Sequence, residues 1–188
     1  MKRLVIKVGT AVLTQGEDLA LQRMKNLVKL ISILKNDKNL EVILVSSGAV
    51  GAGYTELKLD KTILANKQTL AAIGQPKLMK TYQEMFEEFG ITVAQMLFIA
   101  DDFDSRKRTK NAQNVMEILL ENKILPIINE NDVIANYELL FGDNDQLAAH
   151  VAFHFKADML AILSDIDGYY NKNPREFSDA KIQKIINE

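Results

Sequence analysis

The chain has 188 residues, of which 47% are hydrophobic and 26% charged, a balance that is typical of a folded domain with a sizeable core and excludes a disordered chain. Its formal net charge of -2 and the scattered positions of its lysines and arginines leave no basic field, so we expect no nucleic-acid partner. The absence of cysteine excludes disulfides, a thiolate nucleophile and cysteine metal ligands.

The first predicted element is a strand over residues 4–8, whose nearly unbroken apolar side chains are typical of a strand covered on both faces. Lys7 interrupts this apolar run. A buried ammonium group is costly unless an anion balances its charge, so a lysine just before the Gly9-Thr10 turn indicates a bound phosphate or carboxylate. A lysine at a strand end whose ammonium group reaches water is an equally open interpretation.

The same lysine argues against a secretory signal at the amino terminus. Lys2 and Arg3 precede an apolar run that Lys7 ends after three residues. No segment approaches the roughly 20 apolar residues that a membrane span needs. We therefore expect a cytoplasmic protein with no membrane partner.

A helix and a second strand follow. From residue 21, apolar side chains recur at helical spacing and predict an amphipathic helix that leads to a strand over 42–45, which makes a parallel β-α-β unit. This strand ends in the small residues of 46–53, where a ligand can approach the backbone and free amides can hold an anion. Tight packing is the alternative explanation, because the glycine spacing matches neither a Walker loop nor the dinucleotide fingerprint.

Four further elements are predicted between residues 61 and 121. They are helices over 61–73 and 76–89, a strand over 92–97 and a helix over 104–121. The second of these helices would have Pro76 in its first turn and Gly90 just past its end. The last helix is expected to turn Val115, Ile118 and Leu119 inward.

Two polar clusters flank one loop in the second half of the chain. The apolar residues 125–128 predict a buried strand that runs into Asn-Glu-Asn-Asp at 129–132, and Gly-Asp-Asn-Asp follows at 142–145. Asp143 or Asn144 is well placed to cap a helix that begins near Asp145. Each cluster alone is more often a turn or a cap, and only their pairing favours a binding site.

The whole pattern predicts an α/β fold in one domain over residues 1–188. A fifth strand is predicted over 159–163, and four of the strands end in polar or glycine-rich loops. That layout is typical of a doubly wound, mainly parallel sheet with helices on both faces, in three layers, and a site along its carboxyl edge. His150 and His154 lie four residues apart without a third ligand, so we expect no metal site there.

The loops at this edge offer one lysine, hydroxyls, carboxylates and amides, but no histidine or cysteine. A nucleophile that must lose a proton usually needs a base with a pKa near neutrality, which these loops lack. Phosphoryl transfer to a carboxylate fits, because that acceptor is already ionised at neutral pH. Catalysis then reduces to aligning the acceptor and neutralising the charge of the phosphoryl group.

Six segments together resemble the amino acid kinase family. They are Val-Ile-Lys-Val-Gly-Thr at 5–10, Val-Ser-Ser-Gly-Ala-Val at 45–50, Ala-Ile-Gly-Gln at 72–75, Ile-Asn-Glu-Asn-Asp at 128–132, Gly-Asp-Asn-Asp at 142–145, and Asp-Gly-Tyr-Tyr at 167–170 with Asn-Pro-Arg at 173–175. The fourth and fifth favour the branch that phosphorylates free L-glutamate over relatives that act on acetylglutamate, aspartate, carbamate or UMP. The resemblance implies a kinase that uses ATP and Mg²⁺ to make glutamyl 5-phosphate, the first step of proline synthesis.

Carried over residue by residue, the resemblance implies that Lys7 contacts the transferring phosphoryl group and that Asp145 orients this lysine. Gly9 would lie against the nucleotide phosphates. Ser164 and Asp165 would lie in the nucleotide site, with Ser164 where the family often has threonine. The implied glutamate site consists of Ser47, Asp132 and Asn144, supported by Asn129 and Asp143. Such a set suits an amino acid, because an aspartate can pair with its ammonium group while amides and hydroxyls bind its carboxylate without repulsion.

One departure from the family concerns the nucleotide site. Members continue to a Gly-Thr-Gly-Gly-Met loop and a second lysine, whereas this chain ends at Glu188, and the RNA-binding-like domain of longer members does not follow. We therefore expect a domain without the carboxyl-terminal portion of its nucleotide site. A related kinase for acetylglutamate or aspartate, or a non-catalytic amino-acid-binding module, remains the alternative, although Lys7 and Asp145 argue against a pure binder. The resemblance also implies a homo-oligomer and inhibition by proline.

Overall fold

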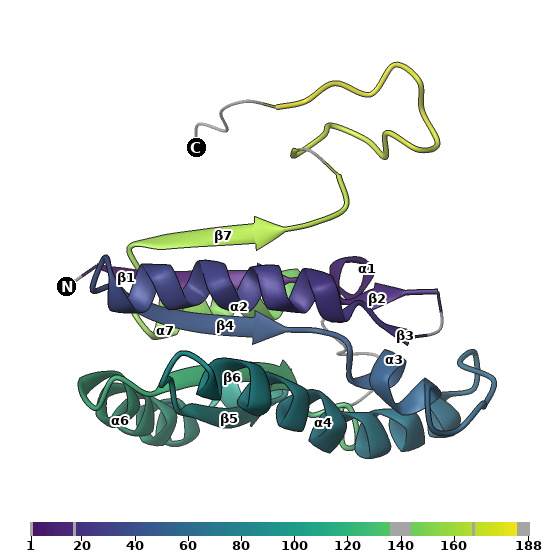
Figure 1. Ribbon diagram of the computed structural model, residues 1–188. Helices are drawn as coiled ribbons and strands as arrows, with labels where there is room; N and C mark the ends of the chain where they lie inside the picture. Colours follow the sequence, from purple (N-terminus) through teal and green to yellow (C-terminus); the bar gives the residue numbers. More distant parts are fainter. Residues whose placement is uncertain (1, 17, 136–143, 167, 184–188) are drawn as a thin grey trace.

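A computed structural model describes residues 2–16, 18–135, 144–166 and 168–183. Its centre is a five-stranded sheet in the order β5 (Val93–Phe98), β6 (Leu125–Glu130), β4 (Glu41–Ser46), β1 (Arg3–Val8) and β7 (Met159–Leu163) (Figure 1). Every neighbouring pair in this sheet is parallel, so the five predicted strands and the mainly parallel sheet are confirmed. Because the strands are parallel, the segments that follow them gather at one edge of the sheet.

The helices connect these strands and cover the sheet. In the described part of the chain they are α1 (Thr10–Leu13), α2 (Leu21–Asn36), α3 (Ala49–Tyr54), α4 (Leu64–Glu87), α5 (Ala100–Asp104), α6 (Arg106–Glu121) and α7 (Asn144–His154). Two short strands, β2 (Thr14–Gln15) and β3 (Asp18–Leu19), form a small antiparallel hairpin after α1.

The sheet has an apolar core on each of its faces. One core contains Ile6 and Val8 of β1 with buried side chains of α2 and α4, and the other contains Val5 with buried side chains of α6 and α7. Successive residues of a strand point to opposite faces, so the nearly unbroken apolar runs can fill both cores. The predicted three-layer arrangement, with helices on both faces of the sheet, is thus confirmed (Figure 1).

Helix α4 corrects the prediction of two separate helices, because it runs from Leu64 to Glu87 with Pro76 inside it. Proline lacks the N–H that would bond to the carbonyl of Ala72. The helix continues through Pro76 because the buried residues on both sides of it form one stripe at four-residue spacing. These residues are Leu70, Gly74, Leu78, Tyr82 and Phe86. Packing of an apolar face contributes more to helix stability than one backbone hydrogen bond does.

The inward face of α6 also differs from the prediction. Val115 and Ile118 are 48% and 60% exposed, and Leu119 is half-buried, whereas Met116 and Leu120 are buried. The apolar arc of this helix is wider than the surface that the sheet and its neighbouring helices cover. Met116 and Leu120, one helical turn apart, therefore take the core contact and leave part of the arc exposed.

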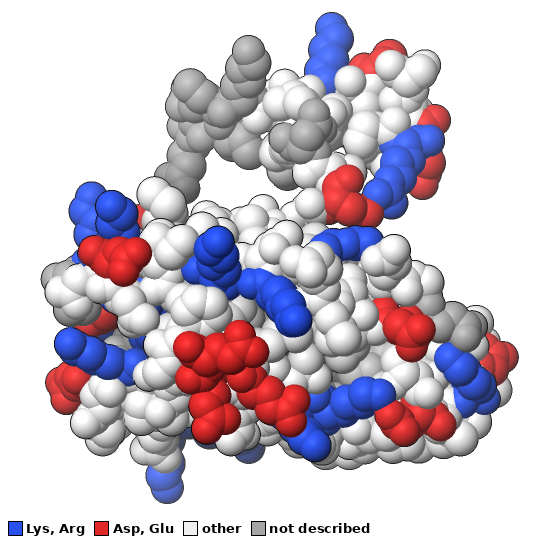
Figure 2. Space-filling view, in the orientation of Figure 1, with Lys and Arg blue, Asp and Glu red and all other residues white. Residues whose placement is uncertain are grey.

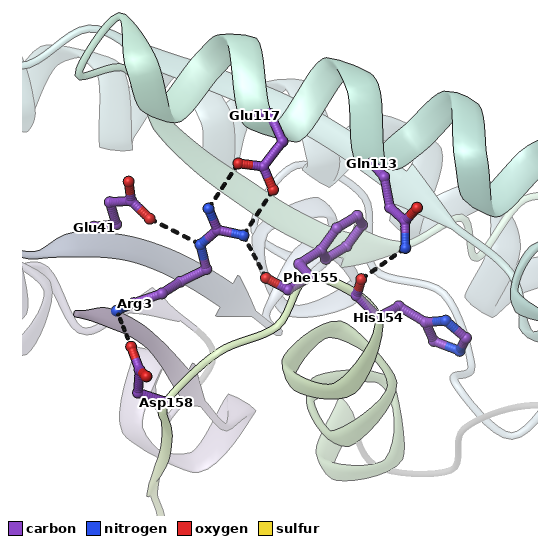
Figure 3. A network of polar contacts seen from close by, with 7 residues as sticks. All are labelled: Arg3, Glu41, Gln113, Glu117, His154, Phe155 and Asp158. Carbon is purple, nitrogen blue, oxygen red and sulfur yellow. Dashed lines mark hydrogen bonds and ion pairs between the residues drawn. The ribbon is translucent and has the colours of Figure 1, made fainter. Parts of the chain in front are cut away.

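Strand β1 contacts both ends of α7. Arg3 and Lys7 lie on the same face of β1, because they are four positions apart and successive residues of a strand alternate between its faces. Arg3 donates to the carbonyl of Phe155, directly after α7, and its guanidinium group makes two hydrogen bonds of 2.8 Å to Glu117 of α6 (Figure 3). At the other end of the strand, Lys7 Nζ lies 2.7 Å from Asp145 Oδ1 in the first turn of α7. Helix α7 is therefore held antiparallel to β1.

The surface carries charges of both signs. On the face shown in Figure 2, lysines and arginines are interspersed with aspartates and glutamates rather than gathered in one patch. None of the helices in the described ranges is long and apolar enough to cross a membrane.

Candidate active site

A cavity of about 310 Å³ opens at the edge of the sheet where the parallel strands end. Its walls come from the segments after β1, β4 and β6, from the beginning of α4 and from the first residue of α7. Four residues that were expected to bind substrate line it together: Ser47, Asn129, Asp132 and Asn144. Two lysines that the sequence did not single out, Lys61 and Lys67, also line it.

The glycine-rich turn after β4 is packed closely against α4. Gly48 has a φ of 103°, a left-handed conformation that favours glycine, and α3 begins at the next residue. Helices α3 and α4 then meet backbone to backbone: a Cβ atom on Gly74 would lie 1.8 Å from the carbonyl oxygen of Ala49, and one on Gly53 would lie 1.9 Å from that of Leu70. Tight packing therefore explains the last glycine of the turn, whereas the beginning of the turn lines the cavity.

Tyr82 supports this turn from inside the core. Its hydroxyl lies 2.9 Å from Ser46 Oγ, and Ser46 Oγ donates its own proton to the carbonyl of Ser47 at 2.9 Å. The tyrosine must therefore be the donor of the first bond. Burial raises the pKa of Tyr82 above its ordinary value, so the phenol keeps its proton. The backbone at Ser47 is thus fixed by a two-bond chain that begins on α4.

Replacing Tyr82 by phenylalanine should lower the free energy of unfolding by about 1 to 1.5 kcal/mol, because one buried hydrogen bond is lost and the ring still fills its place. Chemical denaturation would measure this change. Tyr169→Phe is the matched control, since Tyr169 is 64% exposed and should change stability by less than about 0.5 kcal/mol. Equal stabilities of the two variants would show that the Tyr82 hydroxyl contributes nothing to the support of the turn.

A chain of side-chain amides fixes Asn144. Asn144 Nδ2 donates to Asn129 Oδ1 at 2.8 Å and to the carbonyl of Ser46 at 3.1 Å. Asn129 Nδ2 donates in turn to Gln75 Oε1 at 2.8 Å, and Gln75 Nε2 donates to Gln95 Oε1 at 3.1 Å. The Asn144 side chain thus bonds to β4 and β6 rather than capping α7, as had been one expectation. Asn129 and Gln75 each accept one bond and donate another, and Asn144 donates two, so the chain orients both asparagines at the cavity wall.

Lys7 is buried, with only 2% of its side chain exposed. Its ammonium group lies 2.7 Å from Asp145 Oδ1, and the Asp145 side chain is 44% exposed. A Cβ atom at Gly9 would come within 3.3 Å of Lys7 Nζ, so a glycine at that position leaves room for the ammonium group. The burial excludes the alternative in which this lysine reaches bulk water, and a carboxylate balances its charge.

Asp132 lies half-buried in the segment after β6, at the wall of the same cavity. Burial raises the pKa of its carboxyl group, and the positive charge of Lys67 acts in the opposite direction. These two described side chains form no ion pair, yet their charges influence one another across the cavity wall. The cavity therefore presents an anion and a cation near each other.

Ser164 and Asp165 do not line this cavity. They directly follow β7, where the carbonyl of Leu163 accepts a hydrogen bond of 3.3 Å from the N–H of Gly9. Asp165 pairs with Arg175, and this hydrogen bond lowers the pKa of the aspartate carboxyl group. The residues expected for the nucleotide site thus lie around the ends of β1 and β7, beside the cavity rather than in it.

Sequence reasoning gave no role to Lys67, Gln75 or Tyr82. Gln75 stands beside Gly74 in one of the six segments that resemble the family, and this position could have indicated a role at the site. Tyr82 belongs to the apolar stripe of α4, where nothing distinguishes it from core, and a lysine near a helix start is typical of a solvated surface. Asp143, expected to support the glutamate site, lies outside the described residues.

Comparisons with known sequences cover the whole chain. The Amino acid kinase family matches residues 2–188. Glutamate 5-kinase of Wolinella succinogenes is 58% identical over 191 residues, which cover 100% of this chain and 73% of that protein. Glutamate 5-kinase of Leishmania donovani is 52% identical over 188 residues, covering 100% of this chain and 71% of that protein.

Two solved structures share the fold. An isopentenyl phosphate kinase superposes with a TM-score of 0.65 at 16% identity, covering 99% of this chain and 81% of the other. UMP kinase from Ureaplasma parvum gives a TM-score of 0.61 at 18% identity, covering 96% and 74%. At such low identities the likeness concerns the fold alone.

Proposed function

The chain belongs to the amino acid kinase family, and from that premise we propose that it transfers a phosphoryl group from ATP to the side-chain carboxylate of L-glutamate, giving glutamyl 5-phosphate. The observation that carries the proposal is the ion pair of the buried Lys7 with the partly exposed Asp145, at the sheet edge that also forms a polar cavity. Identities of 58% and 52% to two glutamate 5-kinases support the choice of glutamate as the acceptor.

The reaction needs no general base. The side-chain carboxylate of glutamate is ionised at neutral pH, so one of its oxygens attacks the phosphorus directly. The bond between that phosphorus and the bridging oxygen breaks, ADP departs with its electrons, and no proton moves. Lys7 neutralises charge on the transferring group, and Asp145 holds the lysine in place.

The residues around the ends of β1 and β7 fit the phosphates of a nucleotide. Gly9 places no side chain against Lys7 Nζ, and Ser164 adds a hydroxyl at the end of the neighbouring strand. Mg²⁺ bound with the nucleotide would supply further charge neutralisation.

Glutamate would bind in the cavity through opposite charges and amides. Asp132 offers a carboxylate for the substrate ammonium group, and Asn144 Oδ1 can accept from the same ammonium group, since both Nδ2 protons of Asn144 are donated within the protein. The Ser47 hydroxyl and the second Nδ2 proton of Asn129 can donate to a carboxylate. The amide chain orients the two asparagines before substrate arrives, which reduces the entropy that binding must overcome.

The pH dependence of kcat/KM for glutamate should report Asp132, because this quantity follows the pKa values of the free enzyme. Asp132 attracts the ammonium group only when it is ionised, and burial raises its pKa. As the pH falls, kcat/KM should therefore drop at a higher pH than an ordinary aspartate, with a pKa of about 3.9, would cause.

Asp132→Asn is the control for that prediction, since glutamate itself has carboxyl groups that titrate in acid. The variant should have a raised KM for glutamate at neutral pH. Its kcat/KM should fall at acid pH only as the substrate carboxyl groups titrate, without the additional fall that Asp132 causes in wild type. A KM that rises for ATP but not for glutamate would assign Asp132 to the nucleotide instead.

An ADP-release assay with glutamate, aspartate and acetylglutamate in parallel tests the proposed function. We expect turnover with glutamate to exceed that with the other two acceptors, in the presence of Mg²⁺ and ATP. Turnover with aspartate or acetylglutamate alone would identify a related kinase. Glutamate binding in a calorimeter without any ADP release would identify an amino-acid-binding module.

The same proposal includes several properties that the resemblance implies. They are one amino acid kinase domain over residues 1–188, a place in proline biosynthesis, a cytoplasmic location, a homo-oligomeric assembly and inhibition by proline. Sedimentation analysis and a glutamate titration at fixed proline concentrations would test the assembly and the inhibition.

A further inference from the structure

Lys67 occupies a distinctive position in the cavity wall. It lies in the first turns of α4, is half-buried and faces the same cavity as the amides and Asp132. No described residue forms a hydrogen bond or an ion pair with its ammonium group. A partly desolvated cation whose ammonium group is not bonded by any described side chain favours binding of an anionic group from outside.

The neighbourhood of Asp132 indicates which anionic group this would be. In an α-amino acid, the ammonium group and the carboxylate are bonded to the same carbon, so a site that recognises both needs an anion and a cation close together. Asp132 and Lys67 form such a combination from two separate elements, the segment after β6 and the start of α4. They form no ion pair with each other, and both line the same cavity.

The other lysines at the site are engaged elsewhere. Lys7 pairs with Asp145, in the first turn of α7. Lys61 is exposed, and its Nζ lies 3.7 Å from the centroid of the Tyr54 ring. Lys67 is thus the cation best placed beside Asp132.

We propose that Lys67 binds the α-carboxylate of the amino-acid substrate, while Asp132 binds its α-ammonium group. This inference rests on the proposed function and deepens it. It explains how the site selects acceptors that carry an α-carboxylate in addition to the carboxylate that is phosphorylated. The side-chain carboxylate then extends toward the phosphoryl-transfer site near Lys7, away from Lys67.

The test compares acceptors that differ only at the α-carbon. Isoglutamine carries an α-carboxamide and 4-aminobutyrate lacks the α-carboxylate, yet both keep the carboxylate that accepts the phosphoryl group. Wild-type protein should prefer glutamate over isoglutamine by about 10- to 100-fold in kcat/KM, the range expected for a hydrogen bond to a charged group. In Lys67→Gln, KM for glutamate should rise by a similar factor and kcat should change less than about threefold. The variant should treat the three acceptors nearly alike.

Two further variants separate recognition from structure. Lys67→Arg keeps the charge and should restore most of the preference for glutamate, whereas Lys80→Gln, on the exposed side of α4, should leave all values unchanged. Thermal unfolding of each variant shows whether the fold is intact. An equal loss with glutamate and isoglutamine in Lys67→Gln would overturn the inference, and so would loss of the preference in Lys61→Gln instead.

Calorimetric titration keeps this inference distinguishable from the proposed function. If wild-type protein releases no ADP with glutamate, the proposed function fails, but tighter binding of glutamate than of isoglutamine that disappears in Lys67→Gln still supports the role of Lys67. Equal binding of both compounds by wild type would contradict the role of Lys67, whatever the outcome of the activity assay.

Discussion

Replacing Lys7 by alanine should lower kcat and kcat/KM together by about 10²- to 10³-fold, equivalent to roughly 2.7–4 kcal/mol of transition-state stabilisation. The proposed role of Lys7 is to neutralise charge that develops on the transferring phosphoryl group, a contact that the bound amino acid does not use. Its ammonium group is buried and already paired with Asp145, so it requires little reorganisation during the reaction. Steady-state kinetics with glutamate as the varied substrate would measure the loss.

Glutamate binding and stability serve as controls for Lys7→Ala. The dissociation constant for glutamate should change little in a calorimetric titration. Removal of the lysine side chain leaves Asp145 without this partner and opens a cavity in the core. Lys7→Met is a second variant that removes the charge but fills most of that cavity. Both variants should be equally inactive. Normal turnover by either variant would exclude the proposed catalytic role.

Gly74→Ala should destabilise the protein by about 3 kcal/mol or more, at the upper end of what overpacking costs. A methyl group on Gly74 would lie 1.8 Å from the carbonyl oxygen of Ala49 and 2.3 Å from the backbone nitrogen of Gly53. Backbone atoms cannot rotate away as a flexible side chain does, so α3 and α4 must separate. For a chain of this size the melting temperature should fall by about 6–12 °C.

A loss of stability in Gly74→Ala would demonstrate the close contact between α3 and α4, because helix propensity alone would make the alanine variant more stable. In a helix without tertiary contacts, glycine to alanine would stabilise by about 1 kcal/mol. Ala72→Gly, at an exposed position of the same helix, is the matched control and should destabilise by about that amount. If Gly74→Ala proved as stable as wild type, the close contact between α3 and α4 would not exist. Separation of these helices should also displace the turn at Ser47 and raise KM for glutamate.

The strands were predictable because they are short, mostly apolar runs, four of which end in polar or glycine-rich loops. The continuity of α4 was not, since Pro76 is a strong local signal whose effect is outweighed by the packing of residues far apart in the sequence, such as Leu70 and Phe86. The inward face of α6 was also wrong, because Val115 and Met116 are equally apolar and only the position of the neighbouring elements decides between them.

The candidate site likewise contains residues that the sequence could identify and residues that it could not. Residues that stand in recognisable polar motifs, such as Asn129 and Asn144, could be named from the sequence, and the structure brings them to one cavity. Their roles in binding and catalysis stay predictions. Lys67 could not be named, because only the fold brings the start of α4 to the same cavity as the segment after β6. A surface lysine and a ligand-binding lysine look identical in one sequence.

The double attachment of α7 to β1 limits how this part of the chain can change in length. Four residues of strand from Arg3 to Lys7 span about 13 Å, and ten residues of helix from Asp145 to Phe155 span about 15 Å. The two lengths match closely enough for both contacts to form at once. Inserting or deleting one residue within α7 would rotate one end by about 100° relative to the other and break one of the contacts. Insertions and deletions inside α7 should therefore be poorly tolerated, because the helix links the two ends of β1 at a fixed length.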